Sequence, residues 1–274
     1  MKTKTFIFIL LFFLCSTAIR GEELYLYTTP DDQFNILADD KEILQEVSFV
    51  VQKLREELLE KLGIFYLWDK PAEIIIYDKK KWEKDLSYYF YLKKSKKENL
   101  KGVQTFRQTH LMEEVIFPAV TSLILADIIS MENETISIEQ KNLKLPLCLV
   151  SGLWNYVGHF EDLIEIEKIS SLEFQEIINI ESYPADKNLF YKKSAGLIAF
   201  LLNLPYGRVR LRKLFFRFQQ NKNSSFEDLL FAHYQDLFED KKAFNQKWRE
   251  FMEASILAIE YEKQIRRKVY EKIN

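Results

Sequence analysis

The sequence predicts an α+β protein in which short strands come first and helices follow. Runs rich in β-branched and aromatic residues, bounded by Pro and Asp, occur in the first 110 residues and predict strands. Beyond residue 110, apolar residues recur at the three- and four-residue spacing that is typical of amphipathic helices. The 274 residues are 47% hydrophobic and 29% charged, a composition that can bury a core. Strands followed by helices is the arrangement of an α+β fold.

The first residues have the parts of an export signal. Two lysines within Met1–Thr5 precede an unbroken apolar run at 6–14, and small residues follow at 16–18. We therefore expect residues 1–21 to be a signal peptide and the protein to be periplasmic or secreted. The run is shorter than the roughly 20 residues that cross a bilayer, so we predict no integral membrane span beyond the signal. Alternatives are an uncleaved anchor and lipidation at Cys15, although a leucine precedes this cysteine where a small residue is expected.

Residues 22–110 are predicted to form an N-terminal α+β subdomain. Its long helix runs from Lys41 and ends at Gly63, a residue type common at helix ends. A run of three isoleucines within 71–77 indicates a buried strand. A less regular aromatic stretch, Tyr88–Tyr91, is followed by a lysine-rich surface loop to Lys101. The other strands are predicted at 25–29, 34–37 and 103–107.

Residues 111–274 are predicted to form a helical C-terminal subdomain, because helical spacing dominates after His110 and no convincing strand alternation appears again. Cys148 lies in an apolar run, so we interpret it as a packed core residue and not as a nucleophile. Helices are predicted at about 111–131, 146–160, 172–178, 186–203, 206–220, 226–233 and 241–270.

Charge and motif content argue against several classes of function. The 39 Lys and Arg against 41 Asp and Glu are interspersed and give a net charge of -2, so no nucleic-acid partner is predicted. Seven Gly and three His leave little material for phosphate loops or multi-histidine metal sites. Ser151 lacks the preceding glycine of a nucleophile elbow. We predict no cofactor and no metal.

The second half carries landmarks in an order that resembles the peptidase MA-like proteins, which are gluzincin-type zinc metallopeptidases. In this family one helix carries His-Glu-x-x-His and a second helix carries Glu in a Ser-Glu-Gly motif. The similarity extends over about residues 25–251 and implies a zincin-like fold. The matching landmarks are Ile116-Phe117-Pro118 with Ala119–Leu123, Pro146–Val157, Leu189–Leu202, Ser225–Leu229 and Phe244–Phe251.

Carried over residue by residue, the resemblance implies that every chemical position of the zinc site is substituted. The two ligand histidines fall on Ala119 and Leu123, the catalytic glutamate on Val120 and the third ligand on Ser151. A catalytic zinc needs about three protein ligands and a bound water, and alanine, valine and leucine offer no lone pair. We therefore expect a pseudopeptidase whose former cleft is apolar, suited to gripping a peptide or filled by neighbouring side chains. The expected lining is Ala119, Val120, Ser122, Leu123, Ser151, Trp154, Asn155 and Tyr191.

Two alternatives stay open. An active hydrolase could use His110 with Glu113 or Glu114 on the next turn, although a lone histidine beside carboxylates more often lies at a helix end. His159 and His233 each close a predicted helix, where a cationic ring would complement the helix dipole. The second alternative is a helical envelope protein of unrelated fold, with a coincidental resemblance. A strand containing the three isoleucines, in a sheet beside helix 111–131, would favour the zincin-like fold.

A peptide or protein partner in the cell envelope is expected. The four adjacent rings of Tyr88–Tyr91 cannot all face inward in a strand, so some could line a partner groove. For the charged tail at 260–272, an exposed helix end is favoured over contact with a membrane surface. Asn133 and Asn223 fit glycosylation sequons, which have meaning only in a glycosylating host.

Overall fold

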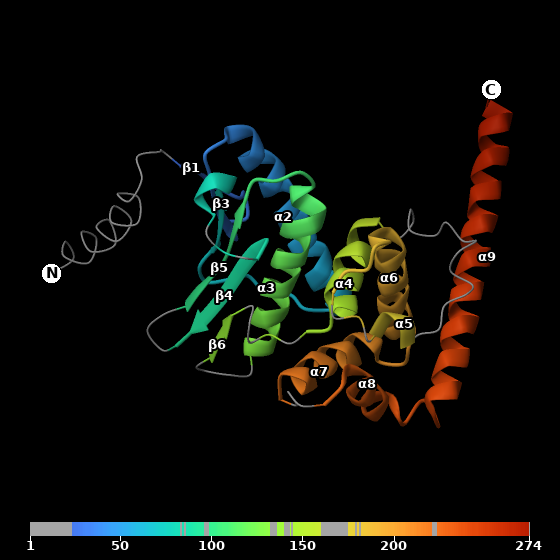
Figure 1. Cartoon of the computed structure of the whole chain (residues 1–274). Helices are drawn as coiled ribbons and strands as arrows, with labels where there is room; N and C mark the ends of the chain where they lie inside the picture. The colour runs from blue at the N-terminus through green and yellow to red at the C-terminus, as the bar shows by residue number, and fades with distance from the viewer. Residues whose placement is uncertain are drawn as a thin grey trace.

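A computed structural model of the chain describes residues 24–82, 84, 86–95, 99–131, 136–139, 143, 145–159, 175–178, 180, 182–220 and 224–273. The predicted signal peptide, Cys15 and the two sequon asparagines lie outside these residues. Figure 1 shows the sheet with helices α2 and α3 beside it, helices α4 to α8 next to these, and helix α9 at the far side. Within the described residues, no helix combines the length and the apolar character that crossing a membrane requires.

The described strands form one mixed sheet in the order β1-β2-β3-β5-β4-β6. Strands β2 and β3 alternate between a buried and a half-buried face, so Ile74 and Ile76 are buried while Ile75 is half-buried. The parallel strands are β2 (Phe34–Ala38), β3 (Ala72–Tyr77) and β5 (Asn99–Phe106). The strands antiparallel to their neighbours are β1 (Tyr25–Thr28), β4 (Tyr88–Lys94) and β6 (Ile136–Glu139).

Two parts of the sheet correct the sequence-based expectations. The second half is mostly helical, but β6 lies within it and pairs with β4, with Ile136 opposite Lys94. Four residues are too few for their alternation to be distinguished from a loop. The lysine-rich segment expected as a loop is strand at both of its ends, because β4 continues to Lys94 and β5 begins at Asn99. The sheet is thus completed beyond residue 110, where the boundary between subdomains was expected.

Helices α2 (Lys41–Leu62) and α3 (Phe117–Ser130) pack on the same face of the sheet, where α2 contacts β2 and α3 contacts β4 and β5. The Asp40 carboxylate accepts the Glu42 backbone N–H at 2.9 Å and so caps the start of α2. Gly63 ends α2 in the left-handed conformation, with φ 65°. The π-helical turn η2 (Met112–Ile116) leads directly into α3. The three isoleucines therefore lie in a sheet that packs on the helix predicted at 111–131.

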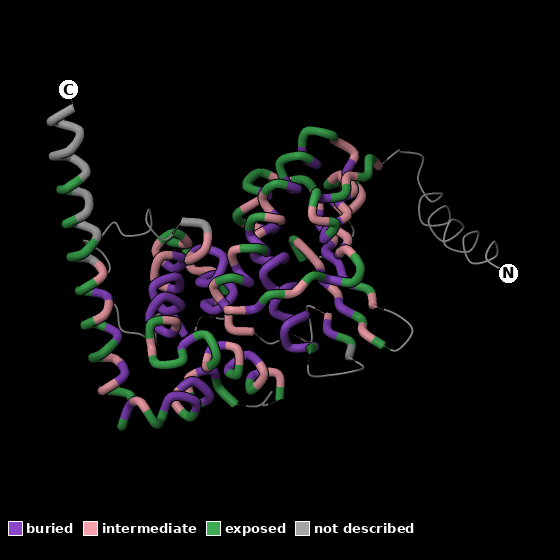
Figure 2. Tube along the Cα trace, turned by 180° about the vertical axis from the view of Figure 1, so that it is seen from behind, coloured by how far each residue is buried: buried purple, intermediate pink, exposed green. Residues whose placement is uncertain are grey.

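The helices beyond α3 share one hydrophobic core with the sheet, and Figure 2 shows buried residues running from the strands into them. Their boundaries agree with the predicted ranges to within a few residues, except that only the last four residues of the helix expected at 172–178 are described as helix. They are α4 (Leu147–His159), α5 (Gln175–Ile178), α6 (Lys187–Asn203), α7 (Gly207–Gln220), α8 (Phe226–Tyr234) and α9 (Lys241–Ile273).

Helices α4 and α6 approach closely at Gly152. A Cβ atom on this residue would lie 2.3 Å from the backbone carbonyl oxygen of Ser194, well inside contact distance. Gly196 on α6 has a different neighbour, since a Cβ atom there would meet the flexible end of Met252 at 2.9 Å. Only glycine therefore allows the observed distance between the α4 and α6 backbones.

Candidate functional site

The four positions matched to a zinc site lie on two neighbouring helices. Ala119, Val120 and Leu123 are in α3, and Ser151 is in α4. The two helices contact each other, and the Phe117 ring of α3 stacks on the Trp154 ring of α4 with centroids 5.1 Å apart. All four positions are 0% exposed. Ala119, Val120 and Leu123 belong to the hydrophobic core, and Ser151 is a buried polar residue beside it.

Aromatic rings pack around Ser151. Its hydroxyl lies 3.3 Å from the Tyr183 hydroxyl, and either group could be the donor. The Tyr183 ring packs edge-on against Tyr191 at 5.7 Å, and Tyr191 packs edge-on against Trp154 at 5.0 Å. Burial raises the pKa of Tyr183, so its hydroxyl stays neutral at physiological pH. A ligand could reach Ser151 only if these rings moved.

The other side chains expected to line the cleft are also buried. Ser122 hydrogen-bonds the Tyr88 hydroxyl, whose pKa is raised chiefly by burial. Asn155 donates its side-chain N–H to the Ser151 carbonyl oxygen at 2.8 Å, within the same helix. The Trp154 indole N–H and the Ser194 hydroxyl are buried and have no hydrogen-bond partner among the described residues. The expected lining residues Ser122, Ser151, Trp154, Asn155 and Tyr191 are thus enclosed in the protein.

The alternative site at His110, Glu113 and Glu114 lies just ahead of α3, and its side chains are not assembled as a ligand set or a catalytic group. His110 is exposed and takes a left-handed backbone conformation, with φ 59°, and its carbonyl oxygen accepts the Glu114 N–H at 3.0 Å. The Glu114 carboxylate forms an ion pair with Lys187 Nζ of α6 at 2.6 Å. In the part of the chain that the structure describes, no three His, Cys, Asp or Glu side chains converge in a way that could hold a metal ion.

The prediction that His233 is a cationic cap at the end of its helix is wrong. It is buried near the end of α8, with Nε2 at 2.8 Å from the Arg210 carbonyl oxygen. Burial lowers the pKa of this imidazole, although the hydrogen bond to Arg210 acts in the opposite direction. A neutral ring that donates from Nε2 fits this environment. The side chain of His159 lies outside the described residues.

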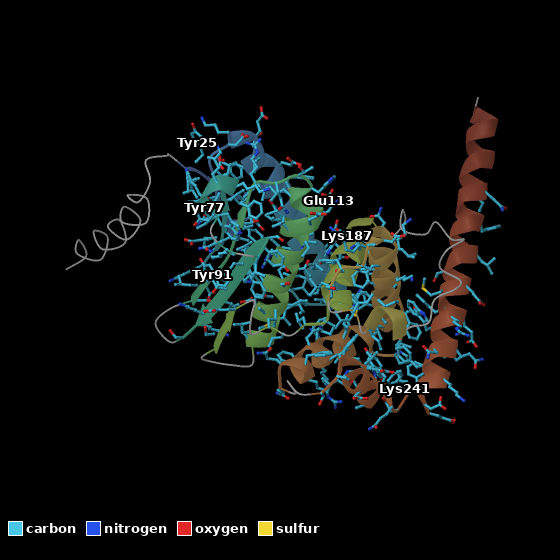
Figure 3. All side chains as sticks on the ribbon, in the orientation of Figure 1. Tyr25, Tyr77, Tyr91, Glu113, Lys187 and Lys241 are labelled. Atoms are coloured by element: carbon cyan, nitrogen blue, oxygen red, sulfur yellow. The ribbon has the colours of Figure 1, made fainter. Side chains whose placement is uncertain are left out.

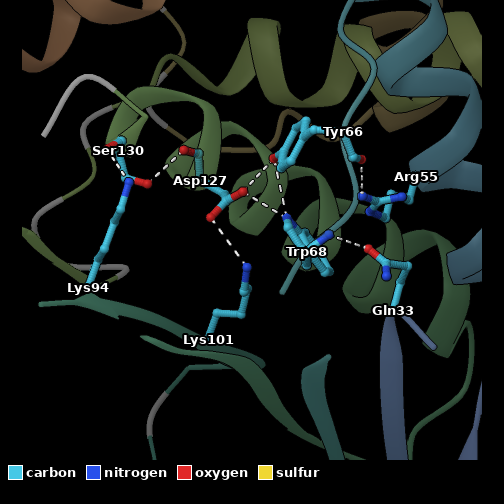
Figure 4. Close-up of polar contacts among 8 residues, drawn as sticks. All are labelled: Gln33, Arg55, Tyr66, Trp68, Lys94, Lys101, Asp127 and Ser130. Atoms are coloured by element: carbon cyan, nitrogen blue, oxygen red, sulfur yellow. Dashed lines mark hydrogen bonds and ion pairs between the residues drawn. The ribbon is translucent and has the colours of Figure 1, made fainter. Parts of the chain in front are cut away.

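A buried charged cluster that the sequence analysis missed lies between α3 and the sheet (Figure 4). The Asp127 carboxylate accepts the Trp68 indole N–H at 2.7 Å and the Tyr66 hydroxyl, and it lies 3.5 Å from Lys101 Nζ. The Asp127 and Lys101 side chains are only 10% and 2% exposed. Asp127 is the only charged residue of α3, and this was the signal, because a buried charge needs a partner.

Two cations also lie over the Trp68 ring. Arg55 is 4.7 Å and Lys101 is 4.4 Å from its centroid. Arg55 additionally donates to the Tyr66 carbonyl oxygen at 2.7 Å. Burial lowers the pKa of Lys101, and the nearby Asp127 carboxylate opposes this shift. The cluster joins α2, α3 and β5 to the segment after α2, so we assign it a structural role.

The aromatic residues of β4 divide between the two faces of the sheet. Phe90 is buried and Tyr88 hydrogen-bonds Ser122, so both lie on the face that α3 covers. Tyr89 and Tyr91 lie on the opposite face, half-buried, with their rings stacked at 6.3 Å. Figure 3 shows Tyr91 on the side of the sheet away from the helices. The expectation that the four rings cannot all face inward is confirmed, and a partner groove at Tyr89 and Tyr91 stays a prediction.

Cys148 is a free, buried cysteine, as predicted, and burial raises the pKa of its thiol. No family model matches the sequence, and the comparison with curated proteins gives no significant match.

Proposed function

We propose that this protein is an exported, non-catalytic metallopeptidase-like protein, a pseudopeptidase that serves as a binding or structural module of the cell envelope. The observation that supports it most directly is the complete burial of Ala119, Val120, Leu123 and Ser151. A catalytic zinc site must leave one coordination position open for water, and the substrate has to reach it. Four enclosed positions, three of them hydrocarbon, meet neither requirement.

The aromatic packing supports a structural use of the former site. Three helices contribute one ring each: Phe117, Trp154 and Tyr191. The Trp154 ring lies between the other two and contacts both. Aromatic pairs of this kind contribute about 0.5–1.5 kcal/mol each beyond their buried area. These rings lie beside the positions that would hold a metal in the resembled family, and they stabilise the packing of α3, α4 and α6 there. A peptide or protein partner would then bind elsewhere, and Tyr89 and Tyr91 offer half-buried aromatic surface for it.

The first test is metal content and hydrolysis by the purified protein. After exposure to zinc and dialysis, we expect elemental analysis to find well below one zinc per chain, and we expect no cleavage of casein. A zinc-dependent peptidase treated in parallel is the positive control. Stoichiometric zinc together with casein cleavage that a chelator abolishes would overturn the proposal.

The second test asks whether the matched positions are packed or open. Leu123→His places a polar ring at a position that is 0% exposed, so it should cost about 2–4 kcal/mol of unfolding free energy. Leu123→Met keeps the side-chain volume and should cost less than about 1.5 kcal/mol. Urea unfolding followed by circular dichroism measures both. Equal stability of the two variants would mean that position 123 lines an open cleft.

A further inference from the structure

Helix α9 is anchored to the fold by its first turns. Phe244, Trp248 and Met252 are buried, and Phe244 packs edge-on against Phe231 of α8 with ring centroids 5.2 Å apart. Met252 contacts the α6 backbone region at Gly196. Beyond Met252 the helix continues to Ile273 and extends past the rest of the described fold (Figures 1 and 2).

This extension carries an exposed apolar stripe. Leu257, Tyr261 and Ile265 are 66%, 66% and 44% exposed. They are spaced by four residues, so they follow one face of the helix. Single exposed apolar residues are normal on a soluble protein, but three in a row along a projecting helix form the kind of patch that marks an interaction site.

The charges of the extension are divided along its length. Residues 253–262 contain three Glu and no Lys or Arg, a net charge of -3. Residues 263–273 contain five Lys or Arg and one Glu, a net charge of +4. Two such helices paired in parallel would bring like charges together. Paired antiparallel about Tyr261, Glu253 of each copy would lie opposite residue 269, in the basic half of the other copy, while Glu260 and Glu262 would lie opposite each other beside the axis.

We propose that the extension of α9 is a self-association surface that binds a second copy of this chain in antiparallel orientation. A two-fold axis at Tyr261 places Leu257 opposite Ile265 of the partner subunit, so each apolar side chain of the stripe meets another. The same patch on both copies is the isologous arrangement of a two-fold dimer. The stripe and the charges away from the axis thus favour the same antiparallel pairing.

The size of the surface sets the expected strength of the dimer. The 21 residues from Glu253 to Ile273 span about 30 Å of helix, at about 1.5 Å per residue. A contact strip about 10 Å wide, the diameter of a helix, buries about 300 Å² on each copy. The total of about 600 Å² is below the roughly 1,200 Å² of a stable interface. The dimer is therefore reversible, depends on micromolar concentrations and weakens in salt.

Sedimentation velocity of the full chain tests this proposal, in 50 mM and 500 mM NaCl and over about 1–300 μM protein. We expect the weight-average mass to rise towards that of a dimer in low salt, and the association constant to fall about tenfold in high salt because the facing charges are screened. Leu257→Glu should remain monomeric. Leu67→Glu, which changes a similarly exposed leucine in the segment after α2, is the matched control and should associate as the unaltered chain does.

Disulfide trapping tests the antiparallel orientation. Leu257→Cys and Ile265→Cys are prepared separately in a Cys15→Ser background, in which Cys148 is buried and does not react. Under mild oxidation, the mixture of the two variants should cross-link faster than either variant alone. Faster linking within a single variant would show parallel pairing and would overturn the proposed orientation.

Three results would overturn the self-association surface itself. One is a mass that stays monomeric at all concentrations in low salt. Another is equal association of Leu257→Glu and Leu67→Glu. The third is a monomeric chain that instead sediments with anionic phospholipid vesicles and is released by Leu257→Glu, which would assign the stripe to a membrane surface. None of these results bears on metal content or hydrolysis, so they leave the proposed function unaffected.

Discussion

Replacing Gly152 by alanine tests whether the close approach of α4 and α6 depends on the absence of a side chain. The added Cβ would lie 2.3 Å from the Ser194 carbonyl oxygen and 2.7 Å from its carbonyl carbon. Ordinary contact begins at about 3.4 Å, so the two backbones must separate by about 1 Å. Overpacking of this kind lowers the unfolding free energy by about 1–3 kcal/mol. We expect a value near the upper limit, because the clash is with backbone atoms of a buried helix.

The helix propensity of alanine opposes this cost, because alanine is favoured over glycine inside a helix by about 1 kcal/mol. The net expectation for Gly152→Ala is a loss of about 2 kcal/mol. For a chain of this size that corresponds to a melting temperature lower by about 4–8 °C.

Gly196→Ala is the matched control on the facing helix. Its new Cβ would meet the sulfur and terminal methyl group of Met252 at 2.9 and 3.0 Å and the Trp248 ring at 3.2 Å. The flexible Met252 side chain can move aside, and the Trp248 ring needs to shift by only a few tenths of an ångström. We expect its stability to stay within about 0.5 kcal/mol of the unaltered protein, because the gain in helix propensity offsets a small rearrangement. Thermal and urea unfolding followed by circular dichroism measure both variants. A Gly152→Ala protein as stable as the Gly196→Ala protein would refute the argument.

Three further predictions follow from buried groups. Asp127→Asn leaves the Lys101 ammonium buried without its counter-charge. Urea unfolding should therefore show an unfolding free energy lower by about 3 kcal/mol, and an unchanged value would show that the pair is dispensable. His233 has a folded-state pKa below its ordinary value of 6.5, so the unfolded chain binds this proton first as the pH falls. The unaltered protein should therefore lose more stability than His233→Gln between pH 7.5 and 5.5, and equal losses would contradict a buried neutral imidazole. Cys148 should resist alkylation in the native protein and react in urea, as peptide mapping would detect; rapid native labelling would contradict its burial.

The sequence predicted the elements that depend on local patterns. The amphipathic spacing of α2 and the glycine at its end located this helix, and Gly63 takes the left-handed conformation that such a glycine serves. Trp154 and Tyr191, which belong to the aromatic packing, were both predicted to line the same cleft. Phe117 appeared only as part of a motif, and Tyr183 was not expected to contact Ser151, because its contact joins residues far apart in the chain.

The elements that were missed depend on tertiary contacts. β6 exists because β4 offers it a partner, and its four residues carry too little pattern of their own. The pairing of Asp127 with Lys101 joins two charged residues that composition alone would place on the surface. Tyr66 and Trp68 reach the same carboxylate from an irregular segment, which has no periodicity to interpret.

The late position of β6 in the sequence affects how the sheet is completed during synthesis. Until residue 139 has emerged from the ribosome, β4 is the outermost strand and has unpaired backbone groups along one side. Lys93 and Lys94 lie at the end of that strand and are two of the four residues with which β6 later pairs. Charged lysines on an unpaired strand oppose pairing with another chain, so they protect the nascent protein from aggregation until its own last strand arrives.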